Sequence, residues 1–149
     1  MLLEYSLFWP RLTRKLPIIP LDERSVFNLP PGNARGSQWS GCFQYNGEMF
    51  WASGIVGSEG GMATIRQDAG ALKVSMAGSA ASLAGGIDAD GGFWAGTQTA
   101  VPQGGTLRTL LKGKFQGTDR FEYSLRPSYL KGSTFENTTR EDGMGSRCQ

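Results

Sequence analysis

The chain of 149 residues contains no histidine. This absence excludes Ser-His-Asp and Cys-His catalysis, histidine-ligated zinc and every proton transfer through an imidazole. Only two cysteines are present, which are too few for a structural zinc or iron–sulfur site within one chain. We therefore expect no metal site and no cofactor, and any catalysis would have to rest on carboxylates.

Long hydrophobic runs and an excess of charge are also missing. No stretch approaches the roughly 18 consecutive apolar residues of a membrane-spanning helix, so no membrane span is expected. The segment MLLEYSLFWPRLTRK has no basic residue before its apolar stretch, which is unlike a secretory signal. The net charge of +2 is too small to predict nucleic acid as a partner. The prediction is a soluble, cytoplasmic protein, with a mature secreted form as the alternative.

Cys42 and Cys148 leave two states open. In a cytosolic protein the expected state is two unpaired thiols. In an oxidising compartment a disulfide between them would tie the tail of the chain to an early strand. The cytoplasmic prediction favours the free thiols.

Proline is concentrated at the N-terminus, where five of the seven prolines precede residue 32. Proline fixes the backbone and lacks a ladder donor, so 1–35 is predicted to be an extended or irregular arm. Its apolar residues, among them Phe8 and Trp9, are too many for a solvated linker. They are expected to cover an open edge or end of the following domain, or the surface of a second subunit. A homo-oligomer formed through 1–35 is therefore one functional hypothesis.

From Gly36 onward, short segments of alternating polar and apolar residues are separated by glycine-bearing turns. A long antiparallel meander loses its exposed edges most simply by closing into a barrel. The predicted fold class is all-β, an eight-stranded antiparallel meander closed into a small barrel over 36–128. A polar, mobile tail is expected over 129–149. The predicted strands are 38–46, 48–56, 61–68, 71–77, 81–88, 92–101, 106–116 and 119–126.

The last two predicted strands show the alternation best. One parity is predicted to face the core: Leu107, Leu111, Phe115, Phe121, Tyr123 and Leu125. The other parity is predicted to face water: Arg108, Lys112, Lys114, Glu122, Ser124 and Arg126. Because aromatic and basic residues fall on opposite faces, the pattern does not predict a nucleic-acid-binding sheet.

The stretch SLAGGIDADGGFWAG at 82–96 sets many small residues beside Phe93 and Trp94. Inside a small barrel, such residues either leave a cavity or let large residues opposite fill the centre. Both outcomes stay open. A cavity would suit a non-enzymatic protein that binds a small apolar or aromatic molecule, which is the leading functional hypothesis. The lining predicted for it comprises Phe43, Tyr45, Trp51, Phe93, Phe115, Phe121 and Tyr123.

A third hypothesis is a small barrel enzyme of the isomerase or hydrolase type, acting through carboxylates at the barrel mouth. No catalytic residue is assigned, and a non-enzymatic role is favoured. The motif IDADGG at 87–92 lacks the further oxygen ligands of a calcium loop and is predicted to be a hairpin turn. The candidate carboxylates are Glu48, Asp68, Asp88, Asp90, Asp119 and Glu122.

The motif GSQWSGCFQYNG at 36–47, the eight-strand meander and a basic residue near its end resemble the calycin superfamily, meaning lipocalins, fatty-acid-binding proteins and avidin-like barrels. The resemblance implies a ligand held inside the barrel. It also implies that a tryptophan of the first strand packs at the closed end beneath an arginine of the last strand. These structural roles would fall to Trp39 and Arg126. The spacing of Gly36 and Trp39 is one residue longer than the lipocalin form, and parity places Arg126 on the outward face.

Overall fold

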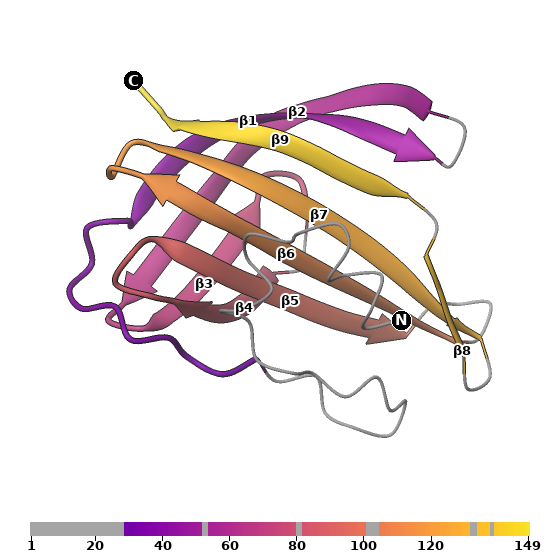
Figure 1. Ribbon diagram of the computed structural model, residues 1–149, viewed down its shortest axis with the longest axis horizontal. Coiled ribbons are helices and arrows are strands. Elements are labelled where there is room, and N and C mark those ends of the chain that lie inside the picture. Colours follow the sequence, from indigo (N-terminus) through magenta and orange to yellow (C-terminus); the bar gives the residue numbers. More distant parts are fainter. Residues whose placement is uncertain (1–28, 52–53, 80–81, 101–104, 132–133, 138) are drawn as a thin grey trace.

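A computed structural model describes residues 29–51, 54–79, 82–100, 105–131, 134–137 and 139–149 (Figure 1). This part of the chain consists of strands and connecting segments without a helix. It therefore contains no helix long and apolar enough to span a bilayer. The strands are β1 (Gly41–Trp51), β2 (Gly54–Asp68), β3 (Ala71–Met76), β4 (Ser82–Ile87), β5 (Gly92–Ala100), β6 (Thr106–Gln116), β7 (Arg120–Lys131), β8 (Thr134–Asn137) and β9 (Arg140–Arg147).

Eight of the nine strands close into an antiparallel barrel. β1 to β7 follow one another as neighbours, and β9 pairs with both β7 and β1 (Figure 1). β8 is a short strand that pairs with Ser128–Lys131 of β7, beyond the part of β7 that pairs with β9. The predicted all-β fold, a meander closed into a small barrel, is confirmed.

Three of the predicted strand boundaries are wrong at the start of the barrel. The segments 38–46, 48–56 and 61–68 form only two strands, β1 and β2. Gly47, which separates the predicted strands 38–46 and 48–56, lies within β1. A Cβ at Gly47 would meet the Tyr123 hydroxyl and the Glu141 side chain. This glycine therefore makes room inside the barrel and does not mark a hairpin.

The closing strand is β9, which lies in the tail that was expected to be mobile. Its inward positions are Glu141, Gly143 and Gly145, opposite Leu125, Tyr123 and Phe121 of β7. Because these positions carry no apolar side chain, hydrophobic alternation does not reveal the strand. The barrel consequently continues beyond residue 128 to Arg147, and the expectation of a mobile tail is corrected for 140–147.

Packed aromatic rings fill one half of the barrel. Phe43, Phe93, Phe115 and Phe121 are at most 6% exposed, and their contacting ring centroids lie 5.2–5.7 Å apart. Glycines lie against two of these rings: a Cβ at Gly113 would overlap Phe93, and a Cβ at Gly145 would overlap Phe121. Small residues thus accommodate large neighbours in this half of the interior.

Residues 29–39 cover the end of the barrel next to these rings. The Gly32 N–H donates to the Gly70 carbonyl and the Ala34 N–H to the Ile87 carbonyl. Trp39 is buried against Phe115. Part of the predicted arm, 29–35, therefore covers an end of its own barrel, while 1–28 lies outside the described residues.

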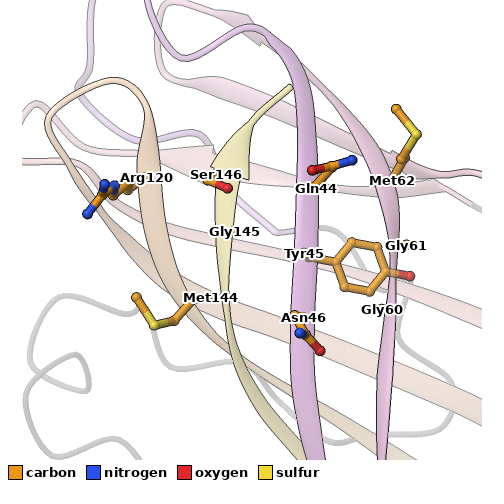
Figure 2. A pocket seen from close by; sticks show the side chains of 10 residues that line it. All are labelled: Gln44, Tyr45, Asn46, Gly60, Gly61, Met62, Arg120, Met144, Gly145 and Ser146. Carbon is orange, nitrogen blue, oxygen red and sulfur yellow. The ribbon is translucent and has the colours of Figure 1, made fainter. Parts of the chain in front are cut away.

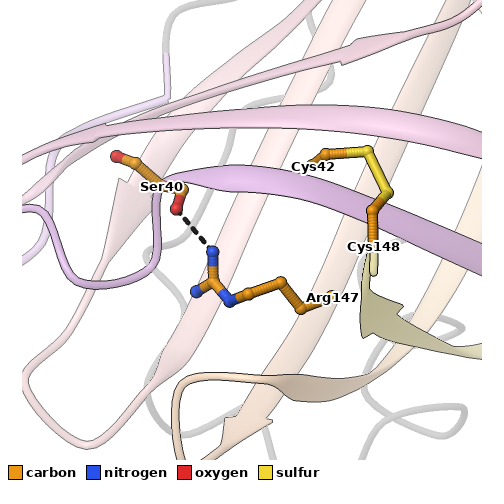
Figure 3. The surroundings of a disulfide bond; sticks show 4 residues. All are labelled: Ser40, Cys42, Arg147 and Cys148. Atoms are coloured by element: carbon orange, nitrogen blue, oxygen red, sulfur yellow. Dashed lines mark hydrogen bonds between the residues drawn. A yellow bond between two sulfur atoms is a disulfide. The ribbon is translucent and has the colours of Figure 1, made fainter.

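Arg147 of β9 is the arginine that lies beside Trp39. Its guanidinium donates a hydrogen bond of 2.8 Å to the Ser40 carbonyl (Figure 3). It donates a second one of 3.1 Å to the Gln38 carbonyl, so the two acceptors lie on either side of Trp39 in the chain. It also lies over the Phe43 ring, 4.7 Å from the centroid. Arg126, the residue expected here, instead lies opposite Leu110 on the outward face of β7.

A disulfide follows directly after Arg147 and joins Cys148 to Cys42 of β1, with their Cα atoms 5.4 Å apart (Figure 3). No free cysteine is present, so the expectation of two unpaired thiols is wrong. Spacing alone could not decide this, because the two cysteines approach each other only when β9 pairs with β1.

Part of the outer surface of β6 and β7 is buried, contrary to the prediction that it faces water. Arg108, Lys112 and Arg126 are 1%, 1% and 5% exposed, whereas Lys114 and Glu122 are exposed as predicted. Burial lowers the pKa of Lys112 to about 7. Alternation along a strand correctly assigns these residues to the outer face but contains no information on what covers that face.

Candidate functional site

The β1–β2 hairpin extends beyond the end of β3 (Figure 1). β3 pairs with β2 only from Ala63 onward, so Gly54–Met62 has no strand on that side within the described part of the chain. All nine residues of Gly54–Met62 are exposed, although successive strand residues point alternately inward and outward. The inner face of the hairpin is therefore accessible to solvent.

Four polar side chains lie between the aromatic core and this exposed part of the hairpin. They are Tyr45 of β1, Glu59 of β2, Tyr123 of β7 and Glu141 of β9, and we call them the mouth cluster. The Tyr123 hydroxyl donates a short hydrogen bond to Oε2 of Glu141, and Glu59 contributes to the electrostatic environment of Glu141. The rings of Tyr45 and Tyr123 meet edge to face, with centroids 6.1 Å apart.

Glycine at two inward positions creates the space for this cluster. Gly47 lies opposite Glu59 on one side and Gly143 on the other. A Cβ at either glycine would meet the Tyr123 hydroxyl. The two glycines therefore allow a tyrosine of β7 to reach across β9 toward β1.

The pKa values of three members of the mouth cluster, Tyr45, Tyr123 and Glu141, are raised. Burial raises the pKa of Glu141 to about 7, with further upward contributions from Glu59, while the hydrogen bond from Tyr123 acts in the opposite direction. Burial also raises the pKa of Tyr123 and of Tyr45, and nearby glutamates add to both shifts. The cluster can thus hold a proton near neutral pH.

The raised pKa of Glu141 predicts a pH-dependent stability. Its folded-state pKa of about 7 exceeds the usual value of 4.5, so the stabilisation is complete below about pH 4.5 and is lost as the pH rises through 7. We expect Glu141→Gln to remove this loss and to exceed the wild type at about pH 8 by on the order of 1–2 kcal/mol.

Chemical denaturation across this pH range measures the effect. Glu122→Gln is the matched control, because Glu122 is an exposed carboxylate on the outward face of β7 and is not among the groups that raise the pKa of Glu141. This control should retain the loss of stability. Parallel curves for the wild type and Glu141→Gln would contradict the assignment.

The residues predicted to line a ligand cavity fall into three groups. Phe43, Phe93, Phe115 and Phe121 pack against one another in the buried core. Tyr45 and Tyr123 belong to the mouth cluster. Trp51 ends β1, and its side chain lies outside the described residues.

Neither mouth carboxylate was among the six candidates from the sequence. Glu59 lies between the predicted strands 48–56 and 61–68, and Glu141 lies in the predicted tail, 129–149. Of the six, Asp119 pairs with Arg147, Asp88 accepts from the Asn33 N–H, and Asp90 accepts from the Gly92 N–H. Only the pairing of β9 with β1 and β7 identifies the cluster, and no local signal does so.

A groove of about 650 Å³ crosses β7, β9, β1 and β2 (Figure 2). Gln44, Asn46 and Met62 line it from outward-facing positions of β1 and β2, so it is not the predicted lumen. The full lining is Gln44, Tyr45, Asn46, Gly60, Gly61, Met62, Arg120, Met144, Gly145 and Ser146.

Comparison with known proteins gives no match, whether to a family model, to a curated protein or to a solved structure. Within the described residues, no group of three or more aspartate, glutamate or cysteine side chains is placed to hold a metal ion. The function therefore has to be argued from the barrel and the mouth cluster.

Proposed function

We propose that the chain is a non-enzymatic binding protein that holds a small molecule at the mouth cluster of its barrel. The carrying observation is the exposed inner face of the β1–β2 hairpin together with the packed aromatic rings of the core. Concave sites with an apolar floor and a few convergent polar groups are typical of small-molecule binding. The closed eight-stranded barrel also supports a calycin-like assignment, in which the ligand lies within the barrel.

The mouth cluster suggests the chemistry of the ligand. The edge-to-face rings of Tyr45 and Tyr123 offer an apolar surface. The carboxyl oxygens of Glu59 and Glu141 offer acceptors for a hydroxyl or amine. We therefore propose a flat, largely apolar molecule with one hydrogen-bond donor, seated across Tyr45 with its donor toward Glu141.

Calorimetric titration tests the site with aromatic alcohols and amines, alongside the same ring systems without a donor. The donor-bearing compounds should bind, and Tyr123→Phe should weaken their binding by about tenfold, because it removes the hydroxyl that orients Glu141. The neighbouring variant Glu122→Gln, on the outward face of β7, should bind like the wild type. Equal binding by Tyr123→Phe, or no binding by any compound, would refute this site.

A proton-transfer enzyme is the second candidate. The specific observation in its favour is a carboxyl group with a pKa of about 7 that is paired with a second carboxyl at the mouth. Glu141 would act as acid or base in an isomerase or hydrolase reaction. Glu141→Gln distinguishes the two candidates, because an enzyme would lose turnover while the fold and binding persist.

The disulfide supports an oxidising compartment for the protein, since such bonds persist there and are rare in the cytosol. We therefore favour the secreted alternative over the cytoplasmic one. Comparison of the cysteine redox state in protein isolated from the two environments tests this choice.

A further inference from the structure

A group of buried side chains lies on the outside of the barrel, across β5, β6 and β7. Residues directly opposite each other on neighbouring strands share one face of the sheet. Trp94 is opposite Lys112 and therefore points outward as Lys112 does, and Leu110 points outward opposite Arg126. A side chain on the outer face of a barrel becomes inaccessible only where another part of the protein packs over it. The outward side chains that are at most 6% exposed, which we call the outer patch, are Trp94, Arg108, Leu110, Lys112, Arg126 and Ser128.

The described chain leads onto the outer patch from its N-terminal side. The Trp94 Nε1–H donates a hydrogen bond of 2.8 Å to the Pro30 carbonyl. A Cβ at Gly86, which is opposite Trp94 on β4, would meet the backbone of Pro30, Pro31 and Gly32. The chain therefore passes from the end of the barrel at Gly32 to its outer surface at Pro30, and the preceding residues start at the border of the patch.

Three members of the outer patch are cations, Arg108, Lys112 and Arg126. A buried charge is costly unless an opposite charge and hydrogen bonds accompany it. The Arg108 guanidinium donates hydrogen bonds of 3.0 and 2.8 Å to the Gln98 amide oxygen, which carries no charge. We therefore expect the segment that covers the patch to combine carboxylates with apolar side chains.

The segment 1–28, which precedes the described residues, has this composition. It is rich in apolar side chains, and its carboxylates are Glu4, Asp22 and Glu23. An extended chain spans about 3.3 Å per residue, so Asp22 can lie up to about 26 Å from Pro30. β7 lies only two strand spacings, about 10 Å, from β5, which places the whole patch within reach. A segment tethered at the border of its site also has an effective concentration in the millimolar range, which favours its own barrel over a second copy.

We propose that 1–28 packs over the outer face of β5, β6 and β7 of its own barrel. Asp22 and Glu23 neutralise the cations of the outer patch, and apolar side chains of the segment cover Trp94 and Leu110. The outer patch is thus an intramolecular docking surface. Release of the segment would expose a cationic and apolar face.

Limited trypsin digestion of the full-length protein tests this docking, because 1–28 contains cleavage sites at Arg11 and Lys15. Proteolysis follows the population of the open form when opening is fast relative to cleavage. The wild type should therefore be cut at these sites at least about tenfold more slowly than a free peptide of residues 1–28.

Variants on both sides of the contact should release the segment. Leu110→Asp removes an apolar contact and adds a carboxylate to the patch, so cleavage of 1–28 should accelerate at least about tenfold. The double variant Asp22→Asn, Glu23→Gln leaves the barrel intact, removes the counter-charges and should have the same effect. Gln116→Asp is the matched control, because it adds the same charge on the outward face of β6 at an exposed position outside the patch. It should be cut like the wild type.

Cleavage at Lys73 on β3 reports on the barrel itself and should stay slow in every variant. If Leu110→Asp accelerates it, the barrel has opened, and the double variant alone decides. Protection of 1–28 should not change over about a hundredfold range of protein concentration. Protection that is lost on dilution would overturn the proposal by assigning the segment to a second copy.

Wild-type cleavage at the rate of the free peptide would also overturn the docking, as would a double variant that is cut like the wild type. The outer patch and the mouth cluster lie on opposite faces of the barrel wall, so none of these results bears on the ligand site.

Discussion

Replacement of Cys42 and Cys148 by serine is expected to lower the free energy of unfolding by about 3–5 kcal/mol. The two residues are 106 positions apart, so the bond restricts a long loop of the unfolded chain. It also joins the first strand of the barrel to the strand that closes it. Because Gly143 and Gly145 bury no side chain of their own, β9 depends on its anchors more than an apolar strand would.

Urea denaturation of oxidised wild type, reduced wild type and the double-serine variant measures this contribution. The reduced wild type and the variant should unfold at the same lower midpoint. Added reductant should leave the variant unchanged, which controls for other effects of the reagent. An oxidised wild type no more stable than the variant would contradict a disulfide that constrains the unfolded chain.

The central part of the fold could be predicted from local signals. The predicted strands 71–77 and 106–116 match β3 and β6 within one residue. Here apolar residues alternate with polar ones, and glycine-bearing turns bound each strand. The first strands and the last were misassigned because glycines occupy inward positions there. Gly47 and Gly143 provide space for Tyr123, and a pattern based on apolar side chains does not detect this role.

The candidate site was less accessible to sequence analysis than the fold. Tyr45 and Tyr123 lie in segments where apolar and polar residues alternate, and the sequence predicts both as residues that line the barrel interior. Glu59 and Glu141 become neighbours only through strand register, which the sequence does not encode locally. The burial of Arg108 and Lys112 could not be predicted either. The alternation of residues along a strand shows which face of the sheet a side chain lies on, but it does not show whether other residues pack over that face.

Gly145→Ala is expected to destabilise the protein by about 2–4 kcal/mol. The φ angle of Gly145 is not positive, so alanine can adopt the backbone conformation there. The added methyl group would instead overlap the Phe121 ring, which is held by Phe43, Phe93 and Phe115. The cost is therefore one of packing, and it depends directly on β9 lying against β7.

A compensating substitution separates this clash from a general intolerance of β9. Phe121→Leu shortens the side chain that the new methyl group meets, so the double variant should be more stable than the sum of the single effects by about 1 kcal/mol or more. Ser146→Ala, the next residue and exposed, should stay within about 0.5 kcal/mol of the wild type. Chemical denaturation of the four variants measures these differences. If Gly145→Ala does not change the stability, β9 does not close the barrel against Phe121. If the double variant regains stability relative to the sum of the single effects, the measured free energies of unfolding support a direct contact between residue 145 and residue 121.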